Sequence, residues 1–382
     1  MKKSLITNKW LWITSALLAI AVVAFLFIPK NGHDFEIDGI YYKVVNDTSN
    51  EVKVTYKGND CKDYRHEYSG VVVIPNKLTY EGKNYTVTEI DDYAFSGCSK
   101  ITSISIPNSV WNIGFCAFSG CEGLREIHIS DLAAWCELSF SDLLDYVGDS
   151  PFHYATELYL NGELVTDIVV PENATHIGAH TFEGYEKLRS VVLHKGIEAI
   201  YKSAFYGCTN LTSVNIPEDA YYIGPYAFDE TYWYENVPEG EVYTGKHLYK
   251  YKGEMPDNTS IVIKEGTVTI CESAFDGCKG LARITIPSSI RCIHNYAFCG
   301  CNNLKEIYCK GQIPPYLNNF YSEYHKDIVL YVPKGAKEIY KNSDNMGYFE
   351  NIKEIDFDNR IGGNQNIRGC KVVEISYTDK AK

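Results

Sequence analysis

One short motif recurs along most of the chain at a nearly fixed spacing. It reads Ala-Phe, one variable residue, then Gly-Cys, and its first two copies place Phe95 and Phe118 23 positions apart (118 − 95). A unit of this length cannot bury its apolar face alone and becomes stable only when it is stacked on copies of itself. Further copies, intact or degenerate, end at Tyr185, Cys208, Thr231, Cys278 and Cys301.

The segment around each copy follows a longer frame, C-x-x-L-x-x-I-x-I-P-x-x-V-x-x-I-G-x-x-A-F-x-G. The I-x-I part alternates with the period of a strand, and the next residue, such as Pro107, ends that strand because proline has no N–H to donate. Stacked copies place these strands side by side. We expect the glycine after the last isoleucine (Gly114, Gly178, Gly224) to permit a tight turn. The predicted fold class is a repeat solenoid of leucine-rich-repeat type, with 23-residue coils and a parallel β-sheet on one face.

Two intervals depart from this spacing. Pro217 and Lys264, which both end frame strands, are two coils apart, so a degenerate coil is expected between them. The interval at residues 131–165 predicts an insertion, with a helix-like amphipathic segment at 131–145 and a hairpin at Asn161–Gly162. We expect one solenoid from Phe35 to Asp358, with only parallel pairing among residues 190–310.

The two ends of the repeat region differ from the frame. Residues 35–90 hold strand-like pieces between Gly and Asn turns, which predict an antiparallel β cap at the N-terminal end. Residues 91–310 form the solenoid, and residues 311–358 hold the last repeats and a mixed C-terminal cap with a short helix at 335–343. Such caps shield the terminal coils and the sheet edges. Residues 359–382 are assigned as a tail.

The N-terminus carries an uncharged apolar run at residues 10–28, about the length that spans a bilayer. Lys2, Lys3 and Lys9 precede the run, which places residues 1–9 in the cytoplasm and the repeats outside it. We expect an uncleaved signal anchor, because small-residue cleavage sites fall inside the run; a cleaved signal peptide is the alternative. The repeats would then lie at the cell surface or in the periplasm.

The net charge and the motifs of the chain limit the classes of function that it can have. The net charge of −13 argues against a nucleic-acid partner, which calls for a basic surface. Of the 13 cysteines, five recur three residues after the repeated Phe, and we expect these five to be buried as small apolar side chains. No zinc-type cysteine pair and no nucleophile, phosphate-loop or dinucleotide motif is found in the sequence. We therefore predict no catalytic residue, cofactor or metal, and a protein that is not an enzyme.

The repeated A-F-x-G-C motif, the coil LTSVNIPEDAYYIG, the segment LYKYKGEMPDNTSIVI and the terminal VLYVPKGAKEIYKNS resemble the BspA-like leucine-rich-repeat family of bacterial surface proteins. The resemblance covers roughly residues 35–358. It implies a solenoid fold and a similarity to adhesins that bind host matrix proteins, other cells or one another. It carries little information on which ligand is bound.

The outward face of the predicted sheet is the candidate binding site, because a long, flat repeat surface suits an extended partner. Tyr308 and Tyr331 are expected on adjacent coils, either as exposed interface anchors or beneath the C-terminal cap. The predicted function is binding of a protein or glycan, with host matrix among the candidates; the alternative is a structural envelope protein without a specific ligand. The candidate residues are Ser105, His128, Asn215, Arg283, Thr285, Tyr308 and Tyr331.

Overall fold

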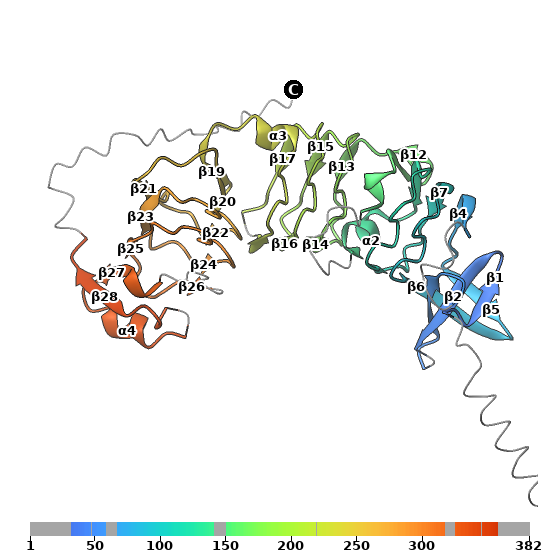
Figure 1. Cartoon of the computed structure of the whole chain (residues 1–382), viewed down its shortest axis with the longest axis horizontal. Coiled ribbons are helices and arrows are strands. Elements are labelled where there is room, and N and C mark those ends of the chain that lie inside the picture. Colours follow the sequence, from blue (N-terminus) through green and yellow to red (C-terminus); the bar gives the residue numbers. More distant parts are fainter. Residues whose placement is uncertain are drawn as a thin grey trace, which may run out of the picture. The chain divides into compact units, whose positions relative to one another are not determined.

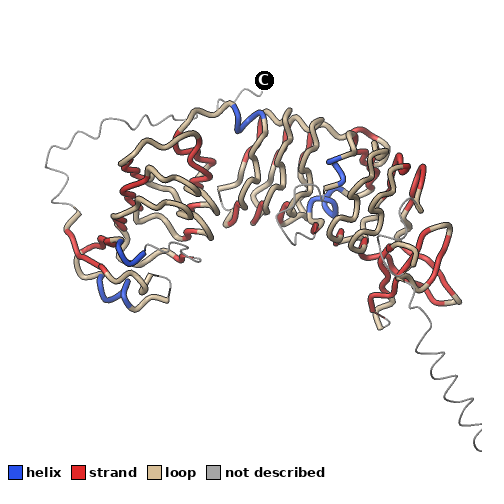
Figure 2. The backbone as a smooth tube through the Cα atoms, in the orientation of Figure 1, coloured by secondary structure: helices blue, strands red, loops and turns tan. Residues whose placement is uncertain are grey.

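A computed structural model describes residues 32–46, 48–58, 67–140, 150–218, 220–317, 325–344 and 346–357. The chain divides into two compact units, the first comprising Met1–His128 and Ser141–Tyr154, and the second Ile129–Phe140 and Ala155–Lys382. In both units, short strands alternate with turns in successive coils of a β-solenoid (Figures 1 and 2). The predicted solenoid is therefore present, and its coils belong to two compact units.

The N-terminal part of the first unit mixes two kinds of pairing. Strands β1 to β3 pair antiparallel in sequence order, as do β5 and β6, whereas β3 pairs parallel with β6. The predicted antiparallel cap is consistent with these hairpins, and β6 connects it to the solenoid, because β6 also pairs in parallel with β8 of the next coil. The bounds are β1 Phe35–Ile37, β2 Ile40–Asn46, β3 Glu51–Thr55, β5 Lys77–Tyr80, β6 Lys83–Ile90 and β8 Asn112–Ile113.

The longer strands of the first unit form a parallel series. β4 (Ser69–Val73) pairs with β7 (Lys100–Ser105), and β7 pairs with β9 (Glu126–Ile129). The register aligns Ser105 with His128, 23 positions later, as the repeat frame requires.

The second unit carries parallel sheets on two faces of its coils. The longer strands form two sheets, β13-β15-β17 and β21-β23-β25-β27-β28, and the shorter ones form β14-β16-β18 and β20-β22-β24-β26. The longer strands are β13 Asp167–Val169, β15 Ser190–Val192, β17 Ser213–Asn215, β21 Thr259–Val262, β23 Leu281–Ile286, β25 Glu306–Cys309, β27 Val329–Pro333 and β28 Asn351–Ile355. The shorter ones, two residues long except for the six-residue β20, are β14 His176–Ile177, β16 Ala199–Ile200, β18 Tyr222–Ile223, β20 His247–Lys252, β22 Thr269–Ile270, β24 Cys292–Ile293 and β26 Tyr316–Leu317.

A column of buried rings runs through the coils between these sheets. Phe182, Phe205 and Phe228 are fully buried and stacked, with ring centroids 5.4 and 5.5 Å apart and planes within 7°. The cysteine of each motif extends the pattern, since the thiol of Cys208 donates to the carbonyl oxygen of Phe182 in the preceding coil. The motif therefore recurs because every coil contributes the same ring and the same turn to one continuous core.

The glycines of the frame have two different structural roles. The glycine of the motif, such as Gly207, has a positive φ that other residues rarely adopt. The expected turn role of Gly114, Gly178 and Gly224 is wrong, because none of them has a positive φ. A Cβ at these positions would lie 2.4, 2.0 and 2.5 Å, respectively, from backbone atoms of the neighbouring coil. They are glycines because the coils approach each other there.

The degenerate coil holds a helix and a hairpin instead of a regular repeat. α3 (Tyr232–Glu235) is followed by β19 (Gly240–Thr244), which pairs antiparallel with β20. The expectation of only parallel pairing among residues 190–310 is thus wrong at this hairpin. Among the described strands, no ladder joins β17 to β21 or β18 to β20, so both faces are interrupted here.

Tyrosines of the hairpin take the place of the missing phenylalanine. Tyr249 is buried and packs edge-on against Phe228, and Tyr251 packs on Phe275 of the following coil. The hydroxyl of Tyr249 donates to the Asp229 carboxylate at 2.6 Å. The ring column therefore continues through the irregular coil with a polar connection.

The insertion and the C-terminal helix are shorter than expected. The predicted hairpin is present, with β11 (Glu157–Leu160) antiparallel to β12 (Glu163–Leu164) and positive φ at Asn161 and Gly162. α2 covers only Leu132–Cys136, and residues 141–149 lie outside the described chain. α4 covers Lys337–Lys341. The remaining elements are β10 (Ser139–Phe140), η1 (Pro151–His153) and η2 (His325–Asp327).

The predicted anchor at 10–28 and the tail at 359–382 both lie outside the described residues. Within the described ranges, no helix is long and apolar enough to cross a bilayer.

Candidate functional site

The register of the C-terminal sheet places four of the candidate residues together. Arg283 and Thr285 lie on β23, Tyr308 on β25 and Tyr331 on β27. Thr285 aligns with Tyr308, and Tyr308 aligns with Tyr331. The two tyrosine rings are stacked with centroids 4.5 Å apart and planes at 9°. Both side chains are half-buried, so neither is enclosed beneath the C-terminal cap. We call this stacked pair the tyrosine platform.

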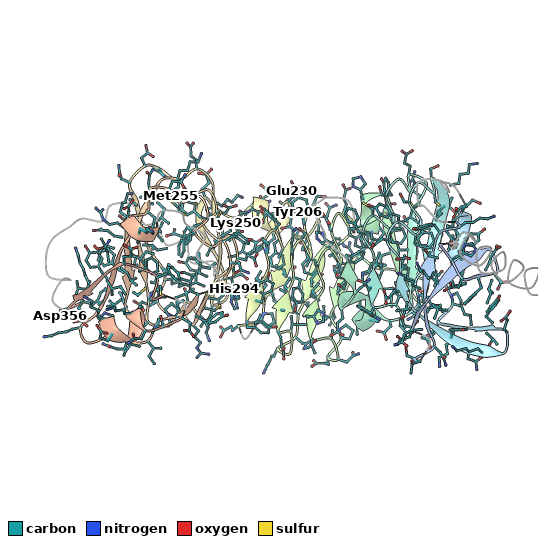
Figure 3. The ribbon with its side chains drawn as sticks, turned by 60° about the horizontal axis from the view of Figure 1, so that its bottom comes forward. Tyr206, Glu230, Lys250, Met255, His294 and Asp356 are labelled. Atoms are coloured by element: carbon teal, nitrogen blue, oxygen red, sulfur yellow. The ribbon has the colours of Figure 1, made fainter. Side chains whose placement is uncertain are left out.

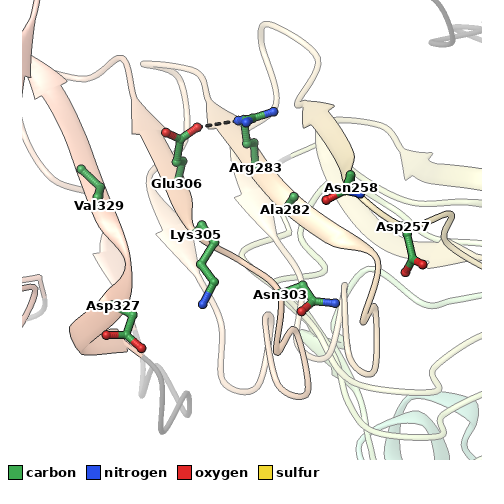
Figure 4. A pocket seen from close by; sticks show the side chains of 9 residues that line it. All are labelled: Asp257, Asn258, Ala282, Arg283, Asn303, Lys305, Glu306, Asp327 and Val329. Atoms are coloured by element: carbon green, nitrogen blue, oxygen red, sulfur yellow. Dashed lines mark hydrogen bonds and ion pairs between the residues drawn. The ribbon is translucent and has the colours of Figure 1, made fainter.

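Glu306 fixes the platform from the same face of the sheet. Its carboxylate accepts hydrogen bonds from the hydroxyls of Tyr308 at 3.1 Å and Tyr331 at 3.4 Å. It also accepts from Nε of Arg283 at 2.5 Å (Figure 4). An ion pair this exposed contributes about 1 kcal/mol at most to stability. Its main effect is therefore to hold the platform and the guanidinium in one arrangement.

A groove of about 550 Å³ begins at this ion pair and follows the amino ends of the strands. Figure 4 shows the side chain of Lys305 between those of Asp327 and Asn303, with Asp257 and Asn258 on the far side. Its volume falls in the range of ligand sites in proteins. The lining residues are Asp257, Asn258, Ala282, Arg283, Asn303, Lys305, Glu306, Asp327 and Val329.

Several polar side chains of the groove have no partner among the described residues. Among the described residues, the side chains of Asp257, Asn258, Lys305 and Asp327 make no hydrogen bond or ion pair. They offer carboxylate and amide acceptors together with ammonium and amide donors. The groove therefore provides hydrogen-bonding groups of both kinds beside an aromatic platform.

The other candidate residues do not join this group. Ser105 and His128 belong to the first unit, where Nε2 of His128 lies 3.0 Å from the Glu126 carboxylate. Asn215 lies on β17, in a separate sheet of the second unit. Its side-chain amide accepts from the Leu193 N–H at 2.8 Å and donates to the Leu193 carbonyl at 3.0 Å. Asn215 is therefore occupied in joining two coils.

Sequence reasoning missed the groove itself. Asp257 and Asn303 lie in turns before their strands and Asp327 lies in η2, whereas the predicted binding residues all occupy outward positions within the strands. A usable signal was present, because Asp257 and Asn303 both lie four residues before the central isoleucine of their strands. The same offset in two coils of a stacked fold places two side chains on one edge of the sheet.

The repeated cysteines belong to the core rather than to a site. All five motif cysteines are buried, as predicted, and no described cysteine forms a disulfide. Burial raises the pKa of Cys121 to about 12 and that of Cys278 to about 11, which disfavours the reactive thiolate. In the described ranges, no group of three or more His, Cys, Asp or Glu side chains is placed to hold a metal ion.

Comparison with known proteins gives one family match and several structural neighbours. The model of the BspA type leucine rich repeat region matches six copies, over residues 77–146, 154–244 and 245–371. A leucine-rich cell surface protein from Faecalibacterium prausnitzii is 21% identical, with a TM-score of 0.36, and the match covers 84% of this chain and 94% of that one. A leucine-rich-repeat protein from Bacteroides ovatus is 22% identical, with a TM-score of 0.29 and coverages of 85% and 90%. The pneumococcal vaccine antigen PcpA is 16% identical, with a TM-score of 0.35 and coverages of 86% and 99%. No curated protein sequence matches significantly.

Proposed function

Since the chain belongs to the BspA-type leucine-rich-repeat family, we propose that it is an exported binding protein whose partner lies across the tyrosine platform and the adjoining groove. The role is binding rather than catalysis, and no cofactor is required. The partner is a protein or a glycan of the cell envelope or of a host matrix. The apolar run at residues 10–28 anchors the protein in the membrane, with the repeats outside the cytoplasm.

The observation that carries this proposal is the combination of an aromatic pair with unengaged polar groups on one flat surface. Tyrosines present apolar area and a hydroxyl at low cost in side-chain entropy, as interface anchors require. Tyr308 and Tyr331 are not needed by the repeat, because the aligned positions of other coils hold Thr285, Asn215 or Ser105. The groove then supplies the polar contacts that give specificity.

A capture experiment with matched variants tests the proposal. The full chain is used to capture partners from envelope extract and from host matrix, and their affinity is measured for the Tyr308→Ser, Tyr331→Ser double variant. Loss of both rings is expected to weaken binding by about tenfold or more. Tyr232→Ser, which removes another exposed tyrosine from α3, is the control and should leave affinity unchanged.

Two results would count against the proposed site. Unchanged affinity in a folded double variant would exclude the platform. Capture of no partner from either extract would favour the structural envelope role instead. A double variant that unfolds would show that the rings serve stability, and Lys305→Ala together with Asp327→Ala would then test the groove without touching the platform.

A further inference from the structure

A second cluster of aromatic and acidic side chains lies in the second unit, on the face formed by the shorter strands. Its residues belong to earlier coils of the chain than the tyrosine platform does. Tyr201 is 38% exposed and Tyr221 is 57% exposed. Burial raises the pKa of the Tyr201 hydroxyl, and the Tyr221 side chain lies close enough to raise it further. The Tyr201 ring also meets the rings of His176 at 5.4 Å and Tyr222 at 5.6 Å. We call these four side chains the aromatic row.

The repeat frame does not explain the two exposed tyrosines. Coils that are aligned with Tyr201 place Gly178 and Gly224 at the same position, since each of the three follows the buried isoleucine of its short strand. The positions aligned with Tyr221 hold Thr175 and Glu198, as the ladder bonds show. Large aromatic side chains at these two sites are therefore additions to the frame rather than part of the core.

A carboxylate that has no side-chain partner in the described part of the chain lies beside these rings. The Tyr221 N–H bonds to the Glu198 carbonyl, so the two residues lie on adjacent coils, and the Glu198 charge acts on Tyr201. Glu198 is exposed, and its side-chain carboxylate makes no hydrogen bond or ion pair with any described residue. A carboxylate beside tyrosine faces is the arrangement that binds an organic cation, through Coulomb attraction and cation–π contact.

Most of the charges that the structure places around the row are negative. Glu137 lies at one end, where it accepts from the Thr175 hydroxyl and approaches His176, and Glu272 lies at the other, where it accepts from the Tyr222 hydroxyl at 2.7 Å. Lys202 lies near Glu272 and favours its charged form. Glu137, Glu198 and Glu272 outnumber this lysine, so the group is acidic and complements a basic partner.

We propose that Tyr201, Tyr221 and Glu198 form a binding surface for an arginine- or lysine-rich protein segment, distinct from the tyrosine platform. The guanidinium or ammonium groups of the segment lie over the tyrosine rings and pair with Glu198. Glu137 and Glu272 extend the acidic stripe along the coils, so that successive basic side chains are accommodated.

Binding of synthetic peptides to the full chain tests this surface. The probe is a labelled octapeptide of alternating arginine and serine, measured at physiological ionic strength against a peptide in which glutamate replaces arginine. The arginine peptide should bind and the glutamate peptide should not. Tyr201→Ser with Tyr221→Ser should weaken binding about tenfold, and Glu198→Gln about threefold.

Matched variants distinguish specific binding at this surface from attraction by the net negative charge of the chain. Glu163→Gln removes the same charge from the exposed β12 and should leave affinity unchanged, as should Tyr308→Ser with Tyr331→Ser. Equal weakening by Glu163→Gln and Glu198→Gln would overturn the proposal, because it would indicate attraction by net charge alone. Binding that needs Tyr308 and Tyr331 would also overturn it, by placing the peptide on the platform.

A further pair of variants keeps the test decisive if the serine variant fails to fold. Phenylalanine at both tyrosine positions retains the ring faces, whereas leucine retains apolar volume without them. The phenylalanine pair should bind the arginine peptide at least half as well as the wild type, and the leucine pair about tenfold more weakly. Equal affinity of the two pairs would exclude cation–π recognition.

Discussion

Phe205 occupies the middle of the buried ring column of the second unit. It is stacked between Phe182 and Phe228 and has no exposed surface. Phe205→Ala should leave a cavity that neighbouring coils cannot fill, and it should lower the free energy of unfolding by about 3–5 kcal/mol. Chemical denaturation measures this change. Tyr232→Ala, at an exposed position, should change stability by less than about 0.5 kcal/mol, and an equal response of both variants would refute a column-based core.

His247 and His294 are buried near the break between β18 and β20, where the shorter sheets are interrupted. His247 is 1% exposed, and its ring nitrogens have no hydrogen-bond partner in the described chain. Nε2 of His294, which is labelled in Figure 3, lies 3.0 Å from the carbonyl oxygen of Tyr221. Burial lowers the pKa of both histidines below the ordinary value of 6.5. Both side chains are therefore neutral in the folded protein at pH 7.

These lowered pKa values make the protein less stable in mild acid. Below pH 6.5 the two histidines bind protons in the unfolded chain but less readily in the folded protein. The free energy of unfolding therefore falls as the pH decreases. The nearby Glu272 acts in the opposite direction above pH 4.5, because burial raises its pKa and the folded state resists its ionisation. A single pH titration of the wild type would mix the two effects.

A variant isolates the histidine contribution. The melting temperature is compared at pH 7.5 and 5.5 for the wild type and for His247→Gln, which cannot become charged. The wild type should lose more stability on acidification than the variant does. The same decrease in both proteins would show that His247 is not the group that titrates.

At the scale of a secondary-structure element, each short strand depends on the close approach of its coil to the preceding one. A Cβ on Gly224, just after β18, would lie 2.5 Å from the Lys202 nitrogen and 2.8 Å from the Tyr201 carbonyl carbon. Gly224→Ala should therefore lower the free energy of unfolding by about 1–3 kcal/mol through forced separation of two backbones. Denaturant unfolding gives the value.

Gly196→Ala provides the matched control for this glycine. It has an ordinary φ, and its added Cβ would meet only the His194 side chain, at 2.9 Å. A side chain yields more readily than a backbone, so this substitution should cost less than Gly224→Ala. Equal costs would show that coil spacing is not what selects glycine after β18.

For the whole molecule, the sequence predicts whatever depends on the repeat period. A constant step of 23 residues fixes the ladder register, so the alignment of Tyr308 with Tyr331 and the burial of the motif cysteines follow from counting. The hairpin at β19–β20 does not follow, because Tyr249 substitutes for phenylalanine from a different backbone conformation. The groove does not follow either, since it combines turn and strand residues of four coils, and the repeat frame does not determine the directions of the turn side chains.

The membrane anchor is the remaining prediction at the scale of the whole molecule. A bilayer core of about 30 Å requires about 20 apolar residues, and the run at residues 10–28 is close to this length. The native protein should therefore begin at or near Met1 and remain with membranes after an alkaline wash. Leu18→Arg places a charge at the centre of the run, at a cost of about 2.5–3.5 kcal/mol, and should reduce the membrane-bound fraction. Thr7→Arg adds the same charge before the run and should not, because positive charge on the cytoplasmic side favours the proposed orientation. A mature N-terminus between Phe25 and Asp34 would instead establish a cleaved signal peptide and a released repeat domain.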